Sequence, residues 1–276
     1  MIYQSIPLRG GKAKLTTYIH EGTQNGKKVA KRPALIVVPG GAYAVHADEE
    51  AEPAALTFLA RGYSTFVLDY SLNEESGYPN TLQEAAEAVK TVREHADEWN
   101  IDSRQIFMMG FSAGAHTTAM LAAEWKSSGI ADVLGCSPQL IRPDKAVLCY
   151  GAMKILQAEE GKDGRAVPAI KSQKAPETDV VSCIGKETVP LFLWHCRYDR
   201  MVPASHSMMI AEKMLEYNRP FELHLFQAGD HMMSVNNRTT DPKGKEIDES
   251  VSQWVPLCDM WLRRKDSHHI RLRLKN

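Results

Sequence analysis

Long hydrophobic runs are missing from this chain of 276 residues. No segment approaches the roughly 18 consecutive apolar residues that a membrane-spanning helix requires. The opening segment, MIYQSIPLRGGKAKLTTYIH, also lacks the apolar stretch behind a basic start that marks a secretory signal. We therefore expect a cytoplasmic protein without a membrane segment.

Cysteine is scarce, and it never occurs in a C-x-x-C pair. The five cysteines are Cys136, Cys149, Cys183, Cys196 and Cys258. Their odd number and wide spacing argue against a disulfide framework and against a zinc site. Cys149 and Cys196 lie inside apolar runs, so we expect them to be reduced core residues. The pair His268–His269 near the C-terminus completes no set of metal ligands, and no metal is expected.

The chain also lacks an excess of charge of one sign. Its 33 Lys and Arg residues balance 34 Asp and Glu residues, and the formal net charge is −1. A balanced charge creates no long-range field that attracts nucleic acid or an anionic membrane surface. The pattern G-x-x-x-x-G-K-[ST] is absent as well, so a phosphate-binding loop is not expected. We expect neither nucleic acid nor a membrane as a partner.

Short apolar runs that alternate with longer helical patterns are what the chain does contain. Strands are predicted over 34–40, 63–70, 105–110, 145–151, 190–196 and 221–226, and helices over 49–61, 81–99, 113–126, 204–217 and 248–264. This alternation predicts an α/β fold, a doubly wound and mostly parallel sheet with helices on both faces. Segments 2–8 and 14–20 predict an N-terminal β-hairpin. The alternating pattern FELHLF at 221–226 places that strand nearer an edge of the sheet.

No repeat or obvious linker divides the chain, which predicts a single domain over residues 1–276. Two stretches depart from the rhythm of strands and helices. Residues 152–189 are polar and rich in Lys, Gly and Pro, and they form either a lid over the sheet or a surface excursion. Residues 263–276 are basic; a solvated terminus and contact with an acidic partner both fit that composition.

One serine stands between two glycines in Gly110-Phe-Ser-Ala-Gly114, after an apolar run and before a helical pattern. A nucleophile elbow requires this context, because the sharp turn exposes the serine hydroxyl above the sheet. The N–H of the next residue, Ala113, then points at the oxyanion that forms during acyl transfer. Alternatively, Ser112 is only a small residue where a strand meets a helix.

A nucleophilic serine needs a base, and the base needs an acid to orient it. Asp199 follows the predicted strand at 190–196, and His231 follows the strand at 221–226. The order serine, aspartate, histidine is that of the α/β hydrolases. Asp230 is the alternative acid, although adjacent residues rarely reach the required geometry. We expect His195, inside a strand, to be a packed residue or a neighbour of the triad.

The strand at 34–40 ends in Gly40 and Gly41, whose small size lets backbone N–H groups approach a substrate. A plain turn between strand and helix would explain the same glycines. We expect Tyr43 and His116 to line the substrate pocket. Glu49 and Glu50 shape its rim or belong to a solvated face.

With these motifs in view, the chain resembles the α/β-hydrolase superfamily, and more narrowly the acetylesterase and acetyl-xylan-esterase-like group of small bacterial esterases. The likeness covers about residues 33–262 and rests on PGGAY, GFSAGAH, LFLWHCRYDRMVP and ELHLFQAGDHMM. It implies Ser112 as nucleophile, Asp199 as acid and His231 as base. It also implies an oxyanion hole made by the backbone of Gly40, Gly41 and Ala113.

Three residues depart from the pattern of this group. Ala42 stands where relatives usually have a third glycine, Glu49 where they tend to have arginine, and Met232 where they tend to have glycine. The first change narrows the oxyanion loop, and the others alter the charge and shape of the pocket. The resemblance therefore carries the triad more securely than the substrate.

The leading hypothesis is a serine carboxylesterase that hydrolyses short acyl esters, acetyl groups on carbohydrates among them, through an acyl-enzyme on Ser112. Its partner is a small-molecule or carbohydrate ester, and its chemistry requires no cofactor. Two alternatives are a serine peptidase with the same triad and a non-catalytic binding protein with the hydrolase fold. A propeller domain, typical of the related oligopeptidases, has no room in this chain. The sequence leaves the oligomeric state open.

Overall fold

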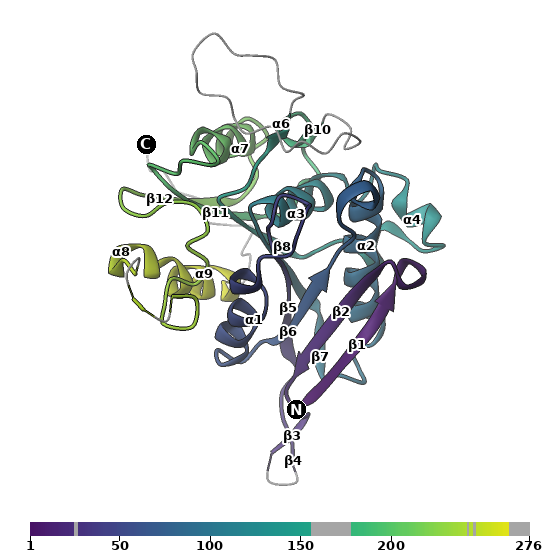
Figure 1. The fold of residues 1–276 in the computed structure, drawn as a ribbon. Helices are drawn as coiled ribbons and strands as arrows, with labels where there is room; N and C mark the ends of the chain where they lie inside the picture. The colour runs from purple at the N-terminus through teal and green to yellow at the C-terminus, as the bar shows by residue number, and fades with distance from the viewer. Residues whose placement is uncertain (25–26, 156–177, 242, 245–246, 265–276) are drawn as a thin grey trace, which may run out of the picture.

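The computed structural model describes residues 1–24, 27–155, 178–241, 243–244 and 247–264, and within them one eight-stranded sheet runs through the molecule (Figure 1). The strand order is β1-β2-β6-β5-β7-β8-β11-β12. All neighbours from β6 to β12 are parallel, whereas β1 pairs antiparallel with β2, and β2 with β6. The predicted doubly wound sheet and its N-terminal hairpin are confirmed, and β12 lies at an edge as expected.

The strands of the main sheet are β1 (Ile2–Leu8), β2 (Ala13–Ile19), β5 (Arg32–Val38), β6 (Ser64–Asp69), β7 (Ile101–Phe111), β8 (Lys145–Cys149), β11 (Leu191–Cys196) and β12 (Phe221–Phe226). Two-residue strands form two further antiparallel pairs: β3 (Thr23–Gln24) with β4 (Lys27–Lys28), and β9 (Lys154–Ile155) with β10 (Thr178–Asp179). Strands β5, β8 and β11 are apolar along most of their length, because helices cover both of their faces.

The α-helices are α1 (Glu52–Leu59), α2 (Asn80–Glu94), α3 (Ala113–Glu124), α4 (Ile130–Val133), α5 (Pro138–Ile141), α6 (Val180–Cys183), α7 (Ser205–Glu216), α8 (Glu249–Ser252) and α9 (Trp254–Arg263). Three 3₁₀ turns complete the set: η1 (Arg9–Gly11), η2 (Asp48–Glu50) and η3 (Asn73–Ser76). Each of the five predicted helices has a counterpart here, but the segment 248–264 is divided into α8 and α9. Helices α4, α5 and α6 are too short to show a periodic pattern in the sequence.

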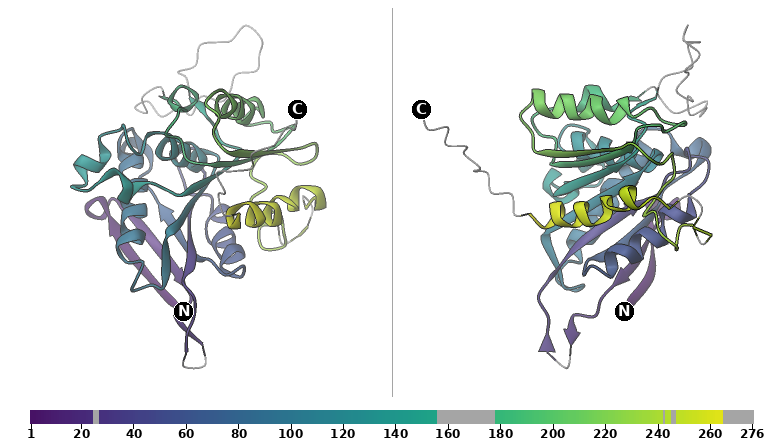
Figure 2. Two further views of the ribbon diagram at one scale, coloured as in Figure 1. Left: turned by 180° about the vertical axis from the view of Figure 1, so that it is seen from behind. Right: turned by 90° about the vertical axis from the view of Figure 1, so that its left-hand side faces the viewer.

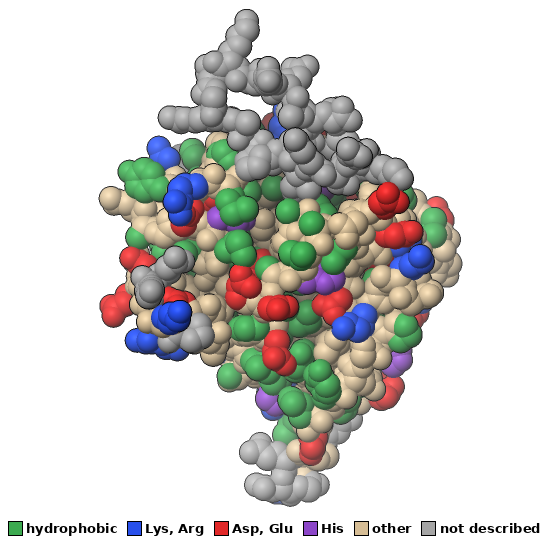
Figure 3. Space-filling model, in the orientation of Figure 1, with side chains coloured by type: hydrophobic (Ala, Val, Ile, Leu, Met, Phe, Trp, Pro, Cys, Tyr) green, Lys and Arg blue, Asp and Glu red, His purple; other side chains and the backbone are tan. Residues whose placement is uncertain are grey.

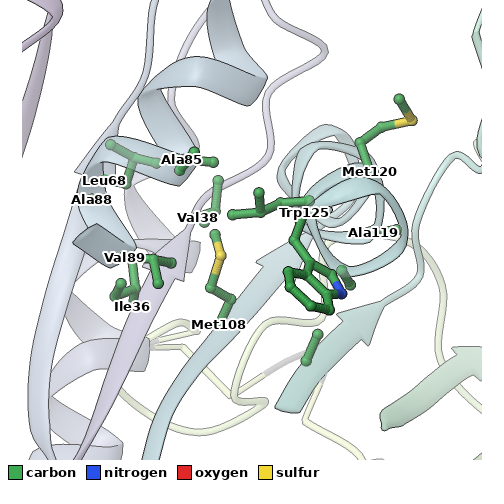
Figure 4. Packing of buried hydrophobic residues seen from close by; sticks show 14 of the residues in the cluster. Ile36, Val38, Leu68, Ala85, Ala88, Val89, Met108, Ala119, Met120 and Trp125 are labelled. Carbon is green, nitrogen blue, oxygen red and sulfur yellow. The ribbon is translucent and has the colours of Figure 1, made fainter. Parts of the chain in front are cut away.

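Two hydrophobic cores lie on opposite faces of the sheet. Helices α2, α3 and α7 cover one face, and α1 and α9 cover the other (Figures 1 and 2). In β5, Ile36 and Val38 point into the first core, whereas Leu35 and Val37 point into the second. Figure 4 shows Ile36 and Val38 in the first core, between the side chains of α2 and α3. The period-two alternation of a strand thus divides the apolar residues between two helical layers.

Most of the predicted excursion at 152–189 lies outside the described residues, as does the basic tail beyond Arg264. The described ends of the excursion form the β9–β10 pair and α6. Its role as a lid and the single-domain organisation stay predictions. Among the described residues, no helix is both long and apolar enough to cross a membrane, and no cluster of metal-ligating side chains occurs. Cys149 and Cys196 are free thiols in the core, as predicted.

Candidate active site

Ser112 occupies a strained turn between β7 and α3. Its φ of 49° and ψ of −113° lie outside the regions that side chains favour. Glycines make the turn possible: a Cβ on Gly110 would lie 2.2 Å from the Gly114 carbonyl oxygen, and one on Gly114 would lie 2.1 Å from that of Val38. The Ser112 N–H donates to the Cys149 carbonyl at 3.0 Å, which ties the turn to β8. The strand end, the turn and the helix start have the geometry of a nucleophile elbow.

Three side chains from the carboxyl ends of β7, β11 and β12 meet in one hydrogen-bonded chain. Ser112 Oγ lies 2.8 Å from His231 Nε2, and His231 Nδ1 lies 2.7 Å from Asp199 Oδ2. Because an ionised carboxylate only accepts, Nδ1 carries the imidazole proton. Nε2 is then the acceptor for the serine hydroxyl, which is the arrangement that a general base requires.

Asp199 is held as a carboxylate by its surroundings, and its side chain has no exposed surface. Burial alone would raise the pKa of Asp199. Hydrogen bonds from His195 and His231, together with the Val202 N–H, outweigh burial and hold that pKa well below its usual range. Oδ1 accepts the N–H groups of Met201 at 2.9 Å and Val202 at 2.8 Å. The carboxylate is thus charged and fixed in direction.

His195, expected to be packed or to border the triad, does both. It is fully buried, and its Nδ1 lies 2.8 Å from Ser207 Oγ. Its Nε2 lies 2.9 Å from the Val202 carbonyl and 3.2 Å from Asp199 Oδ2. Since the Val202 carbonyl can only accept, Nε2 carries the proton. That proton is shared with Asp199, so His195 helps to orient the acid.

Asp230 faces away from the imidazole, although it is adjacent to His231 in the chain. Its Oδ1 accepts the Arg200 N–H at 2.9 Å and the N–H of His231 at 2.8 Å, and Oδ2 pairs with the Arg200 guanidinium. No contact between the Asp230 carboxylate and the imidazole nitrogens occurs in the described part of the chain. The geometry favours Asp199 over Asp230 as the acid.

The loop after β5 supplies candidate oxyanion donors, but with one change from the sequence-based assignment. The Gly40 N–H already donates to Glu50 Oε2 at 2.8 Å, so it is not free for a substrate. Within the described residues, the N–H groups of Gly41 and Ala42 donate no hydrogen bond. Gly41 has a φ of 113° and Ala42 a φ of 55°, both in the left-handed region. Gly41, Ala42 and Ala113, which begins α3, are therefore the candidate donors.

Tyr43 and His116 contact each other beneath the elbow. The Tyr43 hydroxyl lies 2.8 Å from His116 Nδ1 and 2.9 Å from Thr117 Oγ1. Both side chains are buried, and burial lowers the pKa of His116 to about 4, so this histidine is neutral near pH 7. Neither residue lines the hollow beside His231. Their place in the pocket wall stays a prediction.

A hollow of about 800 Å³ opens beside His231. Its lining combines the apolar side chains of methionine and isoleucine with four charged residues, Glu49, Arg200, Asp230 and Asp248. Met232, where relatives were expected to have glycine, also lies on its wall. In the orientation of Figure 3, acidic side chains gather near the middle of the visible face, among hydrophobic ones. The hollow can accept a polar group on the histidine side of Ser112.

Glu49 and Glu50 are adjacent in the sequence, but the structure gives them different surroundings. Glu49 borders the hollow, whereas Glu50 is 1% exposed and bonds to the loop that follows β5. The sequence contains no signal for this difference, because both residues belong to one acidic run before α1.

Comparison with known proteins agrees with the geometry. A family model described as BD-FAE matches residues 23–214. The chain is 29% identical over 217 residues to endo-1,4-beta-xylanase B of Butyrivibrio fibrisolvens, covering 75% of the chain and 33% of that protein. It is 24% identical over 233 residues to an acetylxylan esterase of Xylanibacter ruminicola, covering 80% of the chain and 44% of that protein. The chain thus spans less than half the length of these two relatives.

Among solved structures, the chain is similar to MGS-M1, an α/β-hydrolase enzyme from a Medee basin deep-sea metagenome library. The TM-score is 0.78 and the identity 32%, over 95% of this chain and 96% of that one. This likeness supports the α/β-hydrolase fold over nearly the whole chain.

Proposed function

The chain belongs to the BD-FAE family, and from this premise we propose that it is a serine carboxylesterase that hydrolyses short acyl esters, with acetyl esters of carbohydrates as the preferred class. The observation that carries the proposal is the hydrogen-bonded chain from Ser112 Oγ through His231 to Asp199. The similarity to an acetylxylan esterase supports the choice of acyl group and alcohol.

In the first half of the reaction, Ser112 Oγ attacks the ester carbonyl carbon while His231 Nε2 takes the hydroxyl proton. Asp199 stabilises the imidazolium without accepting its proton. The carbonyl oxygen becomes an oxyanion, which the N–H groups of Gly41, Ala42 and Ala113 stabilise; Ala113 stands at the positive end of the α3 dipole. When the tetrahedral intermediate collapses, the bond to the alcohol oxygen breaks, and the alcohol leaves with the proton from His231.

In the second half, a water molecule attacks the acyl-enzyme. His231 takes one proton from this water, and a second tetrahedral intermediate forms. Its collapse breaks the bond to Ser112 Oγ, which recovers the proton from His231, and the carboxylic acid leaves. The ester and water supply every atom of the two products, so the triad ends in its starting state.

The leaving alcohol lies on the histidine side of the scissile bond, because it receives its proton from His231. The hollow beside His231 opens on the same side, and the carboxylates and Arg200 in its lining are suited to hydrogen bonds with hydroxyl groups. The charged part of this lining supports a carbohydrate as the leaving alcohol.

A peptidase with the same triad would use the acids after the oxyanion loop, among them Glu49, Glu50 and Glu52, to hold a substrate's N-terminal amine. Of these acids, Glu50 is buried, and Glu52 accepts the Tyr18 hydroxyl at 3.1 Å. Glu49 borders the hollow. Because Glu50 is buried and Glu52 is engaged by Tyr18, this run of acids does not form one amine-binding cluster, which favours the esterase.

Ser112→Ala tests the proposed nucleophile. We expect ester hydrolysis to fall by about 10⁶, the scale for loss of a triad serine, while the circular dichroism spectrum and Tm stay close to wild type. The assay compares p-nitrophenyl acetate with aminoacyl-p-nitroanilides. A folded variant that keeps a tenth of the wild-type kcat would remove Ser112 from the mechanism, and a preference for the anilides would favour the peptidase.

A series of p-nitrophenyl esters tests the acyl specificity. We expect kcat/KM to fall steeply beyond about four carbons, because we propose that Ala42 and the bulky Tyr43 of the oxyanion loop limit the space for the acyl chain. Acetate, butyrate, hexanoate and octanoate are compared under one condition. The highest kcat/KM on octanoate would contradict the short-acyl assignment.

A further inference from the structure

Glu50 is a buried carboxyl group that the mechanism above does not use. Its Oε2 accepts the Gly40 N–H at 2.8 Å, and its Oε1 accepts the Tyr150 hydroxyl at 2.7 Å. Burial raises the pKa of Glu50 to about 7, against the opposing effect of these two hydrogen bonds. A carboxyl group is costly to bury. The two contacts that Glu50 makes inside the protein are therefore the place to look for its role.

The first partner is the loop that carries the candidate oxyanion donors. Gly40 immediately precedes Gly41 and lies against both the carboxylate and the nucleophile. A Cβ on Gly40 would lie 2.6 Å from Glu50 Oε2 and 2.9 Å from Ser112 Cβ. The position of this loop relative to Ser112 is therefore coupled to the position of Glu50.

The second partner leads to the loop that carries His231. The Tyr150 hydroxyl accepts the Ser234 N–H at 3.0 Å, and the Tyr150 ring meets the His231 ring edge-on with centroids 4.9 Å apart. Ser234 is further held because its Oγ donates to the Glu49 carbonyl at 2.6 Å. Tyr150 thus supports the histidine from two sides, through its ring and through Ser234.

We propose that Glu50 is a positioning residue that joins the oxyanion loop and the histidine loop through one carboxylate. This inference rests on the proposed esterase function, because a fixed distance between the oxyanion donors and the base matters for that reaction. With both loops held by one group, the donors and His231 keep a constant separation as charge develops on the substrate. Such preorganisation is the largest source of transition-state stabilisation in many enzymes.

Only an acceptor with two oxygens can satisfy both partners. The Gly40 N–H can only donate. The Tyr150 hydroxyl accepts the Ser234 N–H, and its own hydrogen is directed to Glu50. A glutamine offers one oxygen and one NH₂ group, so either Gly40 faces a donor or the Tyr150 hydrogen loses its acceptor. Glu50→Gln therefore breaks one connection while it keeps nearly the same shape.

The test measures kcat and KM on p-nitrophenyl acetate for Glu50→Gln, per mole of Ser112 that reacts with diethyl p-nitrophenyl phosphate. We expect kcat and the rate of phosphorylation to fall together by roughly 10- to 100-fold, because a 1 Å misplacement costs about 10² in rate. KM should stay within about twofold, since ground-state binding is unaffected. A purely structural role would lower Tm and leave kcat per reactive serine unchanged.

Asp48→Asn is the matched control, because Asp48 is exposed in the same 3₁₀ turn and its substitution removes the same charge. It should leave kcat unchanged.

Tyr150→Phe should lower kcat, as Glu50→Gln does. The double variant should lose less than the product of the two single losses, because both substitutions act on one connection. If Glu50→Gln does not fold, Tyr150→Phe decides.

Three outcomes overturn the inference. If the wild type is active and the kcat of Glu50→Gln is within twofold of the wild-type value, the inference is wrong but the proposed function stands. The same holds if Tyr150→Phe folds and its kcat is unchanged. A wild-type protein that neither hydrolyses the ester nor reacts with the phosphate overturns the proposed function, and the inference with it.

Discussion

At the scale of single residues, the site separates acids that look equivalent in the sequence. Asp199 lies 2.7 Å from His231 Nδ1 and accepts two backbone N–H groups, which fix its direction. Asp230 pairs with Arg200 instead. Orientation of the imidazole is therefore a property of Asp199, whereas Asp230 holds the neighbouring loop.

Asp199→Asn and Asp230→Asn form a matched pair of variants. We expect Asp199→Asn to lower kcat by roughly 10⁴, the scale for loss of the correct histidine tautomer. Asp230→Asn should cost about tenfold, through a disturbed contact with Arg200. Both are assayed on p-nitrophenyl acetate, with circular dichroism as the control for folding. The opposite order of the two losses would mean that Asp230 is the acid.

At the scale of elements, the junction of β5, β7 and α3 depends on the absence of side chains. Gly114 is the second residue of α3, and its Cα lies against the backbone at the end of β5. The nearest atom to a Cβ there would be the Val38 carbonyl oxygen, at 2.1 Å. Backbone at the end of a central strand cannot move aside as a flexible side chain can, so close packing of α3 on the sheet requires glycine.

Gly114→Ala should therefore destabilise the protein strongly. We expect a loss of at least about 3 kcal/mol in the free energy of unfolding, the upper range for overpacking, which corresponds to roughly 10 °C in Tm for a chain of this size. The matched control is Gly185→Ala, where a Cβ would meet only the Cys183 carbonyl oxygen at 3.9 Å. Thermal unfolding compares the two, and a Gly114→Ala variant within 2 °C of wild type would contradict the close packing.

At the scale of the whole molecule, stability depends on titratable groups that are buried on different helices, His116 on α3 and His206 on α7. Burial lowers the pKa of both His116 and His206 to about 4 from an ordinary value of 6.5. The unfolded chain therefore binds these protons first as the pH falls. The stability that the neutral histidines provide is fully present above pH 6.5 and is lost progressively as the pH falls toward 4.

His206→Asn tests this dependence, because an asparagine oxygen can still accept the Met153 N–H that His206 Nδ1 now accepts at 2.9 Å. Between pH 7.5 and 5, we expect the wild type to lose about 2 kcal/mol more free energy of unfolding than the variant. This figure follows because pH 5 lies about 1.5 units below the ordinary histidine pKa of 6.5, and each unit contributes about 1.4 kcal/mol. Glu50, whose raised pKa acts in the opposite direction, is present in both proteins, so its effect on the pH dependence of stability cancels in the comparison. Urea unfolding at the two pH values measures the difference, and equal losses would show that His206 is not responsible.

Local patterns in the sequence determined the elements and their order. Short apolar runs marked the central strands, and the glycines around Ser112 marked the elbow, because both depend on neighbours along the chain. Since parallel strands share a carboxyl edge, the positions of Ser112, Asp199 and His231 after three strands also predicted that they meet. The sheet of the structure and the distances between these side chains agree with that reasoning.

Only the tertiary structure decided which polar groups are already engaged. The bonds of Gly40 and Tyr150 to Glu50, of Tyr43 to His116, and of His195 to Asp199 depend on how the loops cross above the sheet. A sequence pattern records the period of an element, and thus which side of it is buried, but not which distant atom its polar groups will meet. For that reason two adjacent glutamates could not be told apart until the fold placed Glu49 beside the hollow and buried Glu50 against the loop after β5.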